Sequence, residues 1–228
     1  MGPTYLPRVK ICCISTVEEA ALAIECGASA LGLVSAMPSG PGVIEEDRIA
    51  EIVATVPPPI ATFLLTSKQN VEETVAQQRR CRTNCLQLCD YLTTGAHTDL
   101  RRALPGIKII QVIHVTGPES VAEAVAVAPS VDALLLDSGN PTLAVKELGG
   151  TGRSHDWSLS RQIRQQVNVP IFLAGGLNAS NVAQAMKAVA PFGLDLCSGV
   201  RTNGKLDRHK LLDFIAAVHS AEQERTAV

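Results

Sequence analysis

Two residues of this 228-residue sequence have side chains suited to acid–base chemistry, and both end short apolar segments. Cys12 ends the first such segment, and Asp137 directly follows three consecutive leucines. A thiol and a carboxyl group can remove and donate protons when their surroundings adjust their pKa values. Each residue also has a purely structural interpretation, because free cysteines often pack as small apolar side chains and aspartates often cap helices or brace loops. Both are therefore candidate catalytic residues.

Two further segments near the C-terminal end of the chain are each followed at once by a glycine-containing turn. Glycine lets backbone N–H groups approach a phosphate closely, and a helix N-terminus that follows adds further donors. Either turn alone is compatible with an ordinary glycine turn, but the two occupy corresponding positions. The sequence therefore predicts a phosphate site at the backbone of Gly175, Gly176, Ser198 and Gly199.

The elements that position these residues follow from a regular alternation of two patterns. Eight short, β-branched and apolar segments alternate with eight longer amphipathic segments, which is typical of consecutive βα units. The predicted strands are 8–12, 30–34, 60–64, 85–88, 107–115, 131–136, 170–174 and 194–197. The predicted helices are 16–26, 45–56, 70–80, 97–104, 119–128, 157–167, 178–189 and 207–221.

Eight βα units predict an α/β fold, a single (βα)₈ TIM barrel that spans residues 1–228. An open, doubly wound sheet is the alternative. In a barrel the active site lies at the C-terminal ends of the strands. Alternation on the first strand places Lys10 and Cys12 on one face and Ile11 on the other, so we expect Cys12 to face the barrel mouth. The loop 138–154, rich in Gly, Pro and Asn, follows the sixth strand at this same end.

Composition excludes several other classes of function. A net charge of −2 and an aromatic content of 3% argue against a nucleic-acid binder, which needs cations and stacking surfaces. No apolar stretch is long enough to span a membrane, and no signal peptide is recognisable. Seven cysteines without a disulfide framework indicate reduced thiols, so we expect a cytoplasmic protein. Cys81, Cys85 and Cys89 recur every four residues, but they run from a predicted helix into a strand and predict no zinc site.

The strand ends and their following turns form an ordered set of short motifs. They are Lys10-Ile11-Cys12, Leu134-Leu135-Leu136-Asp137, Gly149-Gly150-Thr151-Gly152 with Asp156-Trp157, Leu173-Ala174-Gly175-Gly176-Leu177 with Asn181-Val182, and Asp195 with Ser198-Gly199-Val200. In this order, the set resembles the phosphoribosylanthranilate isomerase family over nearly the whole chain.

The resemblance implies an isomerase of tryptophan biosynthesis that needs no metal or cofactor. Such an enzyme converts N-(5-phosphoribosyl)anthranilate to a 1-amino-1-deoxyketose phosphate by an Amadori rearrangement. The resemblance makes Asp137 the general acid, which protonates the furanose ring oxygen, and Cys12 the general base, which removes the C2′ proton. The implied partner is a small phosphorylated sugar, and further substrate-binding side chains are expected from Lys10, Gln87 and Arg153.

Several positions depart from the family pattern, mainly at the anthranilate end of the site. Ser39-Gly40-Pro41 stands where the family has Ser-Pro-Arg, Gln87-Leu88-Cys89-Asp90 where it has Gln-Leu-His-Gly, Cys13 where it has glycine, His155 where it has phenylalanine, and Arg201 where it commonly has glutamate. The missing arginine removes a bidentate partner for a carboxylate. Arg153, His155 and Arg201 are the candidate replacements, and Arg153 is preferred because it lies in the loop after the sixth predicted strand. Two alternatives stay open: a divergent relative that acts on another phosphorylated sugar amine or phosphosugar, and a non-catalytic barrel that binds a phosphorylated ligand or a partner protein.

Overall fold

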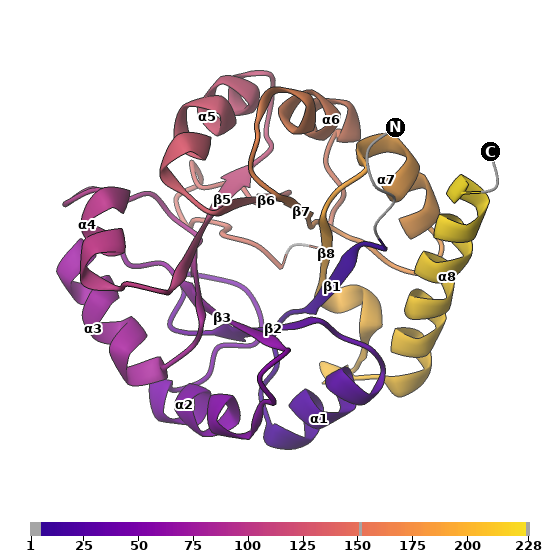
Figure 1. Cartoon of the computed structure of the whole chain (residues 1–228), viewed down its shortest axis with the longest axis horizontal. Coiled ribbons are helices and arrows are strands. Elements are labelled where there is room, and N and C mark those ends of the chain that lie inside the picture. Colours follow the sequence, from indigo (N-terminus) through magenta and orange to yellow (C-terminus); the bar gives the residue numbers. More distant parts are fainter. Residues whose placement is uncertain (1–5, 151, 227–228) are drawn as a thin grey trace.

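Eight parallel strands close into a barrel in the order of the chain, and the helices surround it (Figure 1). The computed structural model describes residues 6–150 and 152–226. Each strand pairs with the next, and β8 pairs with β1 in the register Arg8↔Gly193 to Ile11↔Leu196. The predicted (βα)₈ barrel is confirmed, and the alternative of an open sheet is wrong. The prediction that concerned Thr151 lies outside the described residues.

The structural elements agree with the predicted segments to within a few residues at most ends. The strands are β1 Arg8–Ile11, β2 Ala30–Val34, β3 Ala61–Thr66, β4 Cys85–Leu88, β5 Lys108–His114, β6 Ala133–Asp137, β7 Ile171–Leu173 and β8 Gly193–Leu196. The helices are α1 Val17–Glu25, α2 Glu46–Thr55, α3 Val71–Cys81, α4 His97–Ala103, α5 Glu119–Val127, α6 Trp157–Gln166, α7 Val182–Val189 and α8 Arg208–Thr226. Shorter elements are the 3₁₀ turns η1 Ala128–Ser130 and η2 Ser198–Val200, and a hairpin of β9 Arg201–Thr202 with β10 Lys205–Leu206.

Side-chain hydrogen bonds explain where two of the helices begin. Thr16 Oγ1 accepts a hydrogen bond from Glu19 N, the first half of a capping box, while the Glu19 carboxylate accepts from Ser15 N rather than from the Thr16 backbone. Helix α7 begins four residues later than predicted. Asn178 and Asn181 hydrogen-bond each other and the carbonyl of Gly176, and these bonds hold the segment as a turn.

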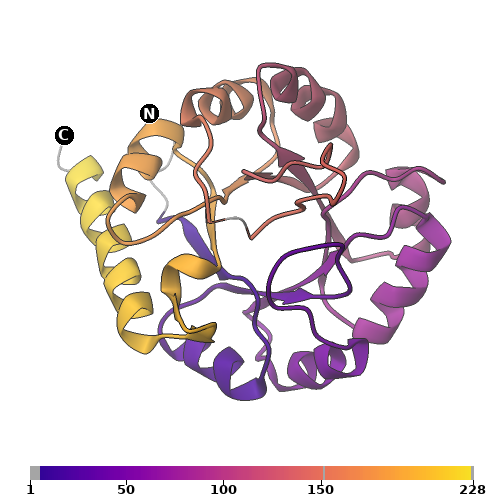
Figure 2. The ribbon, with the colours of Figure 1, turned by 180° about the vertical axis from the view of Figure 1, so that it is seen from behind.

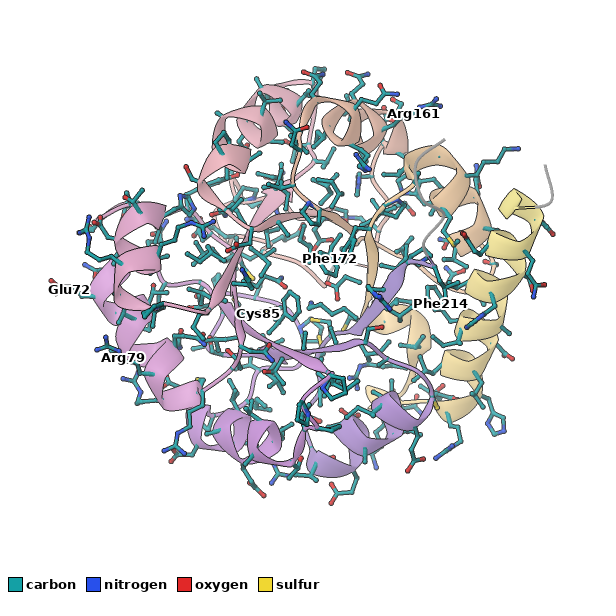
Figure 3. All side chains as sticks on the ribbon, viewed as in Figure 1. Glu72, Arg79, Cys85, Arg161, Phe172 and Phe214 are labelled. Carbon is teal, nitrogen blue, oxygen red and sulfur yellow. The ribbon has the colours of Figure 1, made fainter. Side chains whose placement is uncertain are left out.

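The core has two parts, one on each face of the barrel wall. Residues such as Ile11, Leu134 and Leu136 pack between strands and helices, whereas Leu135 and Phe172 alternate to the interior. In Figure 3, Phe172 and Cys85 lie near the barrel axis and Phe214 lies between α8 and the wall, while Glu72, Arg79 and Arg161 lie at the periphery. Filling of the interior by side chains makes the barrel a packed core, so a ligand site must lie at its mouth.

The C-terminal mouth of the barrel is partly covered by two loops. Seen from behind, the loop that follows β2 and the loop that follows β6 cross the centre of the barrel (Figure 2). Ser39 Oγ in the first loop donates to the Lys146 carbonyl in the second at 2.6 Å. The contact joins segments 107 residues apart and places both loops over the strand ends. Within residues 6–150 and 152–226, no helix combines the length and apolarity that crossing a membrane requires.

Candidate active site

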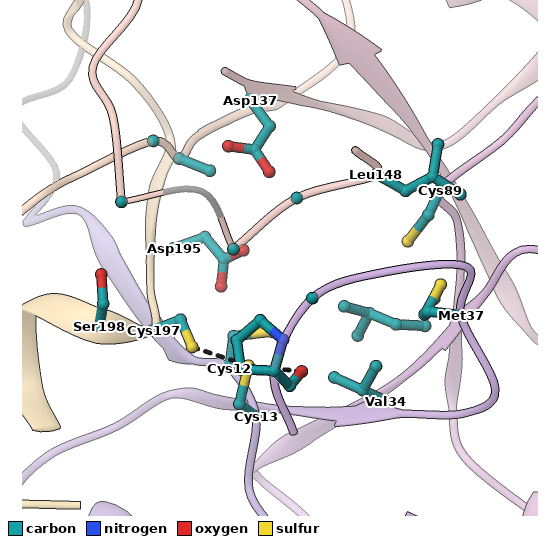
Figure 4. Close-up of a pocket in the computed structure, with 18 of the residues that line it drawn as sticks. Cys12, Cys13, Val34, Met37, Cys89, Asp137, Leu148, Asp195, Cys197 and Ser198 are labelled. Carbon is teal, nitrogen blue, oxygen red and sulfur yellow. Dashed lines mark hydrogen bonds between the residues drawn. The ribbon is translucent and has the colours of Figure 1, made fainter. Parts of the chain in front are cut away.

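One pocket opens at the C-terminal ends of the strands, beneath the two loops. Its lining comes from β1, β2, β3, β4, β6, β7 and β8 or from the segments that follow them (Figure 4). Among the sequence-predicted site residues it contains Cys12, Gln87, Asp137, Gly175, Gly176 and Ser198. The structure therefore brings both candidate catalytic residues and three of the four predicted phosphate-binding residues to one place.

Cys12 lies one residue beyond β1 and continues its pairing with β8. Its backbone N–H donates to the Leu196 carbonyl at 2.7 Å, and the residue is only 7% exposed. A Cβ on Gly32 would lie 3.0 Å from Cys12 Sγ and 3.0 Å from Lys10 Nζ. Glycine at this point of β2 therefore leaves the room that the two side chains fill. The thiol points into the barrel mouth, as alternation predicted.

Lys10 lies one layer below Cys12, inside the barrel. Its Nζ donates to Asp195 Oδ1 at 2.8 Å and stands 5.2 Å from the centre of the Phe63 ring. Burial opposes the charge of the ammonium group, but the neighbouring Asp195 carboxylate and the Cys12 thiol outweigh it and raise the pKa of Lys10. Lys10 is therefore a cation beneath the pocket, and it is not among the residues that line it.

Asp137 ends β6 and lies across the pocket from Cys12 (Figure 4). Its Oδ1 accepts a hydrogen bond from Ser138 N at 2.7 Å, which fixes the carboxylate at the strand end. A Cβ on Gly149 would stand 2.8 Å from Oδ2, and Gly149 has a φ of +135°. Glycine thus lets the backbone of the β6 loop pass directly over the carboxylate. A molecule in the pocket would meet the thiol and the carboxylate on opposite sides.

The turns after β7 and β8 meet the end of the β6 loop at one edge of the pocket. Gly175 and Gly176 have φ values of +87° and +63°. A Cβ on Gly175 would stand 3.1 Å from both the Arg153 carbonyl and His155 Nδ1, so a larger residue fits only if these neighbours move by a few tenths of an ångström. Gly199 is outside the lining, because its backbone packs on the Leu177 carbonyl, 2.0 Å from where a Cβ would be. Close backbone packing of this kind is what a phosphate site made of amides requires.

The opposite end of the pocket is apolar and carries one buried amide. Val34, Met37, Leu65 and Leu148 form its walls, and the described lining residues include no Lys or Arg. Gln87 is 3% exposed, and its Nε2 makes only a long contact of 3.7 Å with Cys89 Sγ. Its Oε1 has no hydrogen-bond partner within the described residues. An unpaired buried amide oxygen is costly and points to a ligand that satisfies it.

Arg153 and Arg201 lie near the site but form their ion pairs outside the pocket. Arg153 pairs with Glu147, has a side chain 60% exposed, and lies outside the lining. Arg201 pairs with Glu19 at 2.8 Å and donates to the carbonyls of Cys12 and Cys13 at 3.1 and 2.6 Å, so it braces the end of β1. Neither guanidinium lies at the apolar end, where the family's arginine is missing.

Asp195, Cys13 and Cys197 are among the pocket residues that were not assigned from the sequence. Asp195 lines the pocket and pairs with Lys10. The sequence signal for this pairing is that β1 and β8, two apolar strands that lie side by side in a closed barrel, each contain a charged residue of opposite sign. Cys13 and Cys197 also line the pocket. Alternation would have turned Cys13 toward the helices, but its φ of +62° breaks the strand and redirects it. Such a φ is hard to foresee at a non-glycine residue.

Comparisons with known proteins show which family the chain is similar to. Residues 9–217 match the family model described as N-(5'phosphoribosyl)anthranilate (PRA) isomerase. The chain is 36% identical over 219 residues to N-(5'-phosphoribosyl)anthranilate isomerase 2 of Methanosarcina mazei, with 95% of each chain covered. It is 33% identical over 214 residues to the isomerase of Methanocella arvoryzae, covering 93% of this chain and 98% of the relative.

Solved structures show the same likeness. The phosphoribosyl anthranilate isomerase of Thermotoga maritima superposes with a TM-score of 0.78 at 28% identity, over 94% of this chain and 99% of that one. A second such isomerase, in complex with reduced 1-(o-carboxyphenylamino)-1-deoxyribulose 5-phosphate, gives a TM-score of 0.75 at 26% identity, with the same shares covered. The family model and the relatives each span most of the chain, and the chain belongs to the N-(5'-phosphoribosyl)anthranilate isomerase family.

Proposed function

We propose that the chain isomerises N-(5-phosphoribosyl)anthranilate to 1-(o-carboxyphenylamino)-1-deoxyribulose 5-phosphate, with Asp137 as general acid and Cys12 as general base. The observation that carries the proposal is their placement on opposite sides of one pocket, at the ends of β6 and β1. Acid and base act on different atoms of the sugar, so they must reach it from different directions.

The reaction needs two proton transfers in sequence. Asp137 would protonate the furanose ring oxygen, and the ring would open to a Schiff base as the C1′–O bond breaks. The Cys12 thiolate would then take the proton from C2′, which leaves an enolamine that tautomerises to the ketone. Both steps use side chains of this chain, and the proposal includes no metal or cofactor.

The phosphate and the aromatic ring would occupy opposite ends of the pocket. Backbone amides of the turns after β7 and β8, near Gly175, Gly176, Ser198 and Gly199, would bind the phosphate. The close packing of the backbone at this edge of the pocket supports the assignment of these amides to the phosphate. The ring would lie between Val34, Met37 and Leu148, and the Gln87 amide would bind the anthranilate. Gln87 is favoured over Arg153 because it lines the pocket and has an unpaired oxygen.

The decisive experiment is an isomerase assay in which the substrate is made in situ and the loss of its anthranilate fluorescence is followed. We expect Cys12→Ala and Asp137→Ala each to lower kcat by a factor of about 10² to 10⁴, the usual contribution of a general acid or base. Cys26→Ala is the matched control, because it removes a buried thiol that lies outside the pocket. Thermal unfolding establishes that each variant is folded.

The outcomes separate the three possible functions. A folded wild-type protein without activity would favour a divergent relative with another phosphorylated sugar amine or phosphosugar as substrate. Activity that survives both substitutions would overturn the acid–base assignment. Phosphate binding without activity toward any phosphorylated sugar amine or phosphosugar would favour a non-catalytic barrel. Residence in the cytoplasm is part of the same proposal, and fractionation of the source cells tests it.

A further inference from the structure

Three thiols gather where the first strand of the barrel meets the last. Cys12 and Cys13 follow β1, and Cys197 follows β8. The Sγ atoms of Cys13 and Cys197 are 2.7 Å apart and belong to residues separated by 184 positions (Figure 4). This distance is shorter than the usual separation of two sulfur atoms that only touch, so the two thiols lie within reach of a covalent bond.

The backbone explains why the two thiols meet. Ile11 and Leu196 are register partners, so β1 and β8 end level with each other. Cys13 then takes the left-handed conformation, with a φ of +62°, and its side chain turns back over the strand ends instead of toward the helices. Gly42 fits closely beside it, since a Cβ there would stand 2.5 Å from Cys13 Cβ. The β2 loop therefore limits how far the Cys13 side chain can move away.

We infer that Cys13 and Cys197 form a modification site, at which a low-molecular-weight disulfide such as oxidised glutathione converts the two thiols into a reversible disulfide across the β1–β8 seam. A disulfide needs an S–S distance of about 2.05 Å. The sulfurs need to approach by only about 0.7 Å from their present 2.7 Å. The bond therefore forms with little movement of either strand.

The chemistry balances as a two-electron exchange. The Cys197 thiolate attacks one sulfur of the small disulfide, and the S–S bond of the reagent breaks and releases one thiolate. Cys13 gives its proton to the released thiolate and then attacks the Cys197 sulfur, which expels the second small thiolate. That thiolate takes up the proton that Cys197 lost to solvent. The two protein thiols are oxidised to one disulfide, and the reagent is reduced to two thiols.

The order of attack follows from exposure and environment. Cys197 is partly exposed, whereas Cys13 is 6% exposed. A hydrogen bond with Cys13 lowers the pKa of Cys197, burial opposes this, and Arg201 adds to the lowering. Hydrogen bonds with Cys12 and Cys197, together with burial, raise the pKa of Cys13. Cys197 is thus the thiol that the reagent reaches first.

Cys12 is an unfavourable partner for Cys13 in spite of its proximity. Consecutive Cα atoms across a trans peptide are about 3.8 Å apart, whereas a disulfide normally needs about 4.4 to 6.8 Å between them. A bond between Cys12 and Cys13 would therefore strain the chain. The inferred disulfide leaves the Cys12 thiol free and does not depend on the proposed isomerase reaction.

A bond at this position would stabilise the barrel. It would close a loop of most of the chain and fasten the seam between the first and last strands, which restricts the unfolded chain strongly. We expect the oxidised protein to unfold about 5–15 °C above the reduced protein.

The test treats the wild-type protein with oxidised glutathione and measures Tm on one portion. A second portion is unfolded in denaturant, its remaining thiols are blocked with iodoacetamide, and intact mass and linked peptides are measured. We expect a peptide linking Cys13 to Cys197, five alkylated thiols, and a rise in Tm that dithiothreitol reverses. Cys197→Ser and Cys13→Gly should show no linked peptide and no reversible rise, and glycine suits the positive φ at residue 13. Cys26→Ala, which removes a buried thiol elsewhere, should behave as wild type.

Three results would overturn the inference. They are a glutathione adduct that persists on Cys197, a linked peptide that contains Cys12, and a linked Cys13–Cys197 pair that does not raise Tm. None of these readouts uses catalysis, so failure here is distinguishable from failure of the proposed function.

Discussion

Lys10 and Asp195 form an ion pair inside the barrel, directly beneath the Cys12 thiol. Nζ and Oδ1 are 2.8 Å apart, and the two side chains are 0% and 9% exposed. The residues are register partners on β1 and β8, the two strands whose pairing closes the barrel. Because a buried charge without a partner is very costly, the pair permits only the register that brings both residues level. It therefore links closure of the barrel to the position of Cys12.

We predict that Lys10→Met destabilises the protein by about 3–5 kcal/mol, because Asp195 is left as a buried, unpaired carboxylate. The double variant Lys10→Met/Asp195→Asn should recover a large part of this loss, since no charge then stays buried. Urea unfolding of the wild type, both single variants and the double variant forms a complete cycle. Additive losses in the double variant would show that the two groups are not coupled.

Gly175 tests the phosphate site, and the chain supplies a matched control for it. Gly175 and Gly106 have nearly the same φ, +87° and +89°, but a Cβ at Gly175 meets Arg153 and His155 whereas nothing lies within 4 Å of one at Gly106. We predict that Gly175→Ala raises KM at least about tenfold, because the turn must move away from the phosphate. Gly106→Ala should cost about 1 kcal/mol of stability and leave KM unchanged. Equal effects of the two substitutions on KM would count against a phosphate at this turn.

Gln87 and Arg153 are competing contacts for the anthranilate end. A hydrogen bond to a charged group contributes about 1.5–3 kcal/mol, so Gln87→Leu should raise KM about tenfold to a hundredfold with a smaller effect on kcat. Arg153→Ala removes an exposed pair with Glu147, which lies outside the pocket lining. We expect it to change KM by no more than about fivefold. Steady-state kinetics of both variants show which residue contacts the anthranilate. A larger rise in KM for Arg153→Ala than for Gln87→Leu would assign the contact to Arg153.

The barrel and the two central residues were predictable because their signals are local. Each strand shows its own apolar run, and Cys12 and Asp137 stand at strand ends, where a barrel places its active site. Alternation over Lys10, Ile11 and Cys12 was enough to predict that the Cys12 side chain faces the barrel mouth. The short hairpin of β9 and β10 was not predicted, because two-residue strands are too short to show a period.

Relations between distant residues were not predictable from one sequence. The pairing of Lys10 with Asp195 joins positions 185 apart, and the bond from Ser39 to Lys146 joins two loops that have no periodic pattern. The place of Arg153 depends on which way a glycine-rich loop folds, and it folded so that Arg153 meets Glu147 outside the pocket. In each case the deciding interaction exists only after the barrel has closed.

His155 should make the stability of the protein sensitive to mild acid. Burial lowers its pKa below the ordinary value of 6.5, although the carboxylates of Asp137 and Asp156 oppose the shift. The folded state therefore binds fewer protons than the unfolded state below pH 6.5. The stabilising contribution of neutral His155 is complete above pH 6.5 and is lost as the pH falls through the lowered pKa.

We predict that Tm decreases more steeply below pH 6.5 in the wild type than in His155→Phe, by a few degrees over this range. Loss of the 2.6 Å bond from His155 to Ser160 shifts the Tm of the variant at every pH, so the slope is the informative quantity. His219→Gln, an exchange at an exposed position of α8, should keep the wild-type slope. Parallel curves for the wild type and His155→Phe would mean that His155 does not carry this sensitivity.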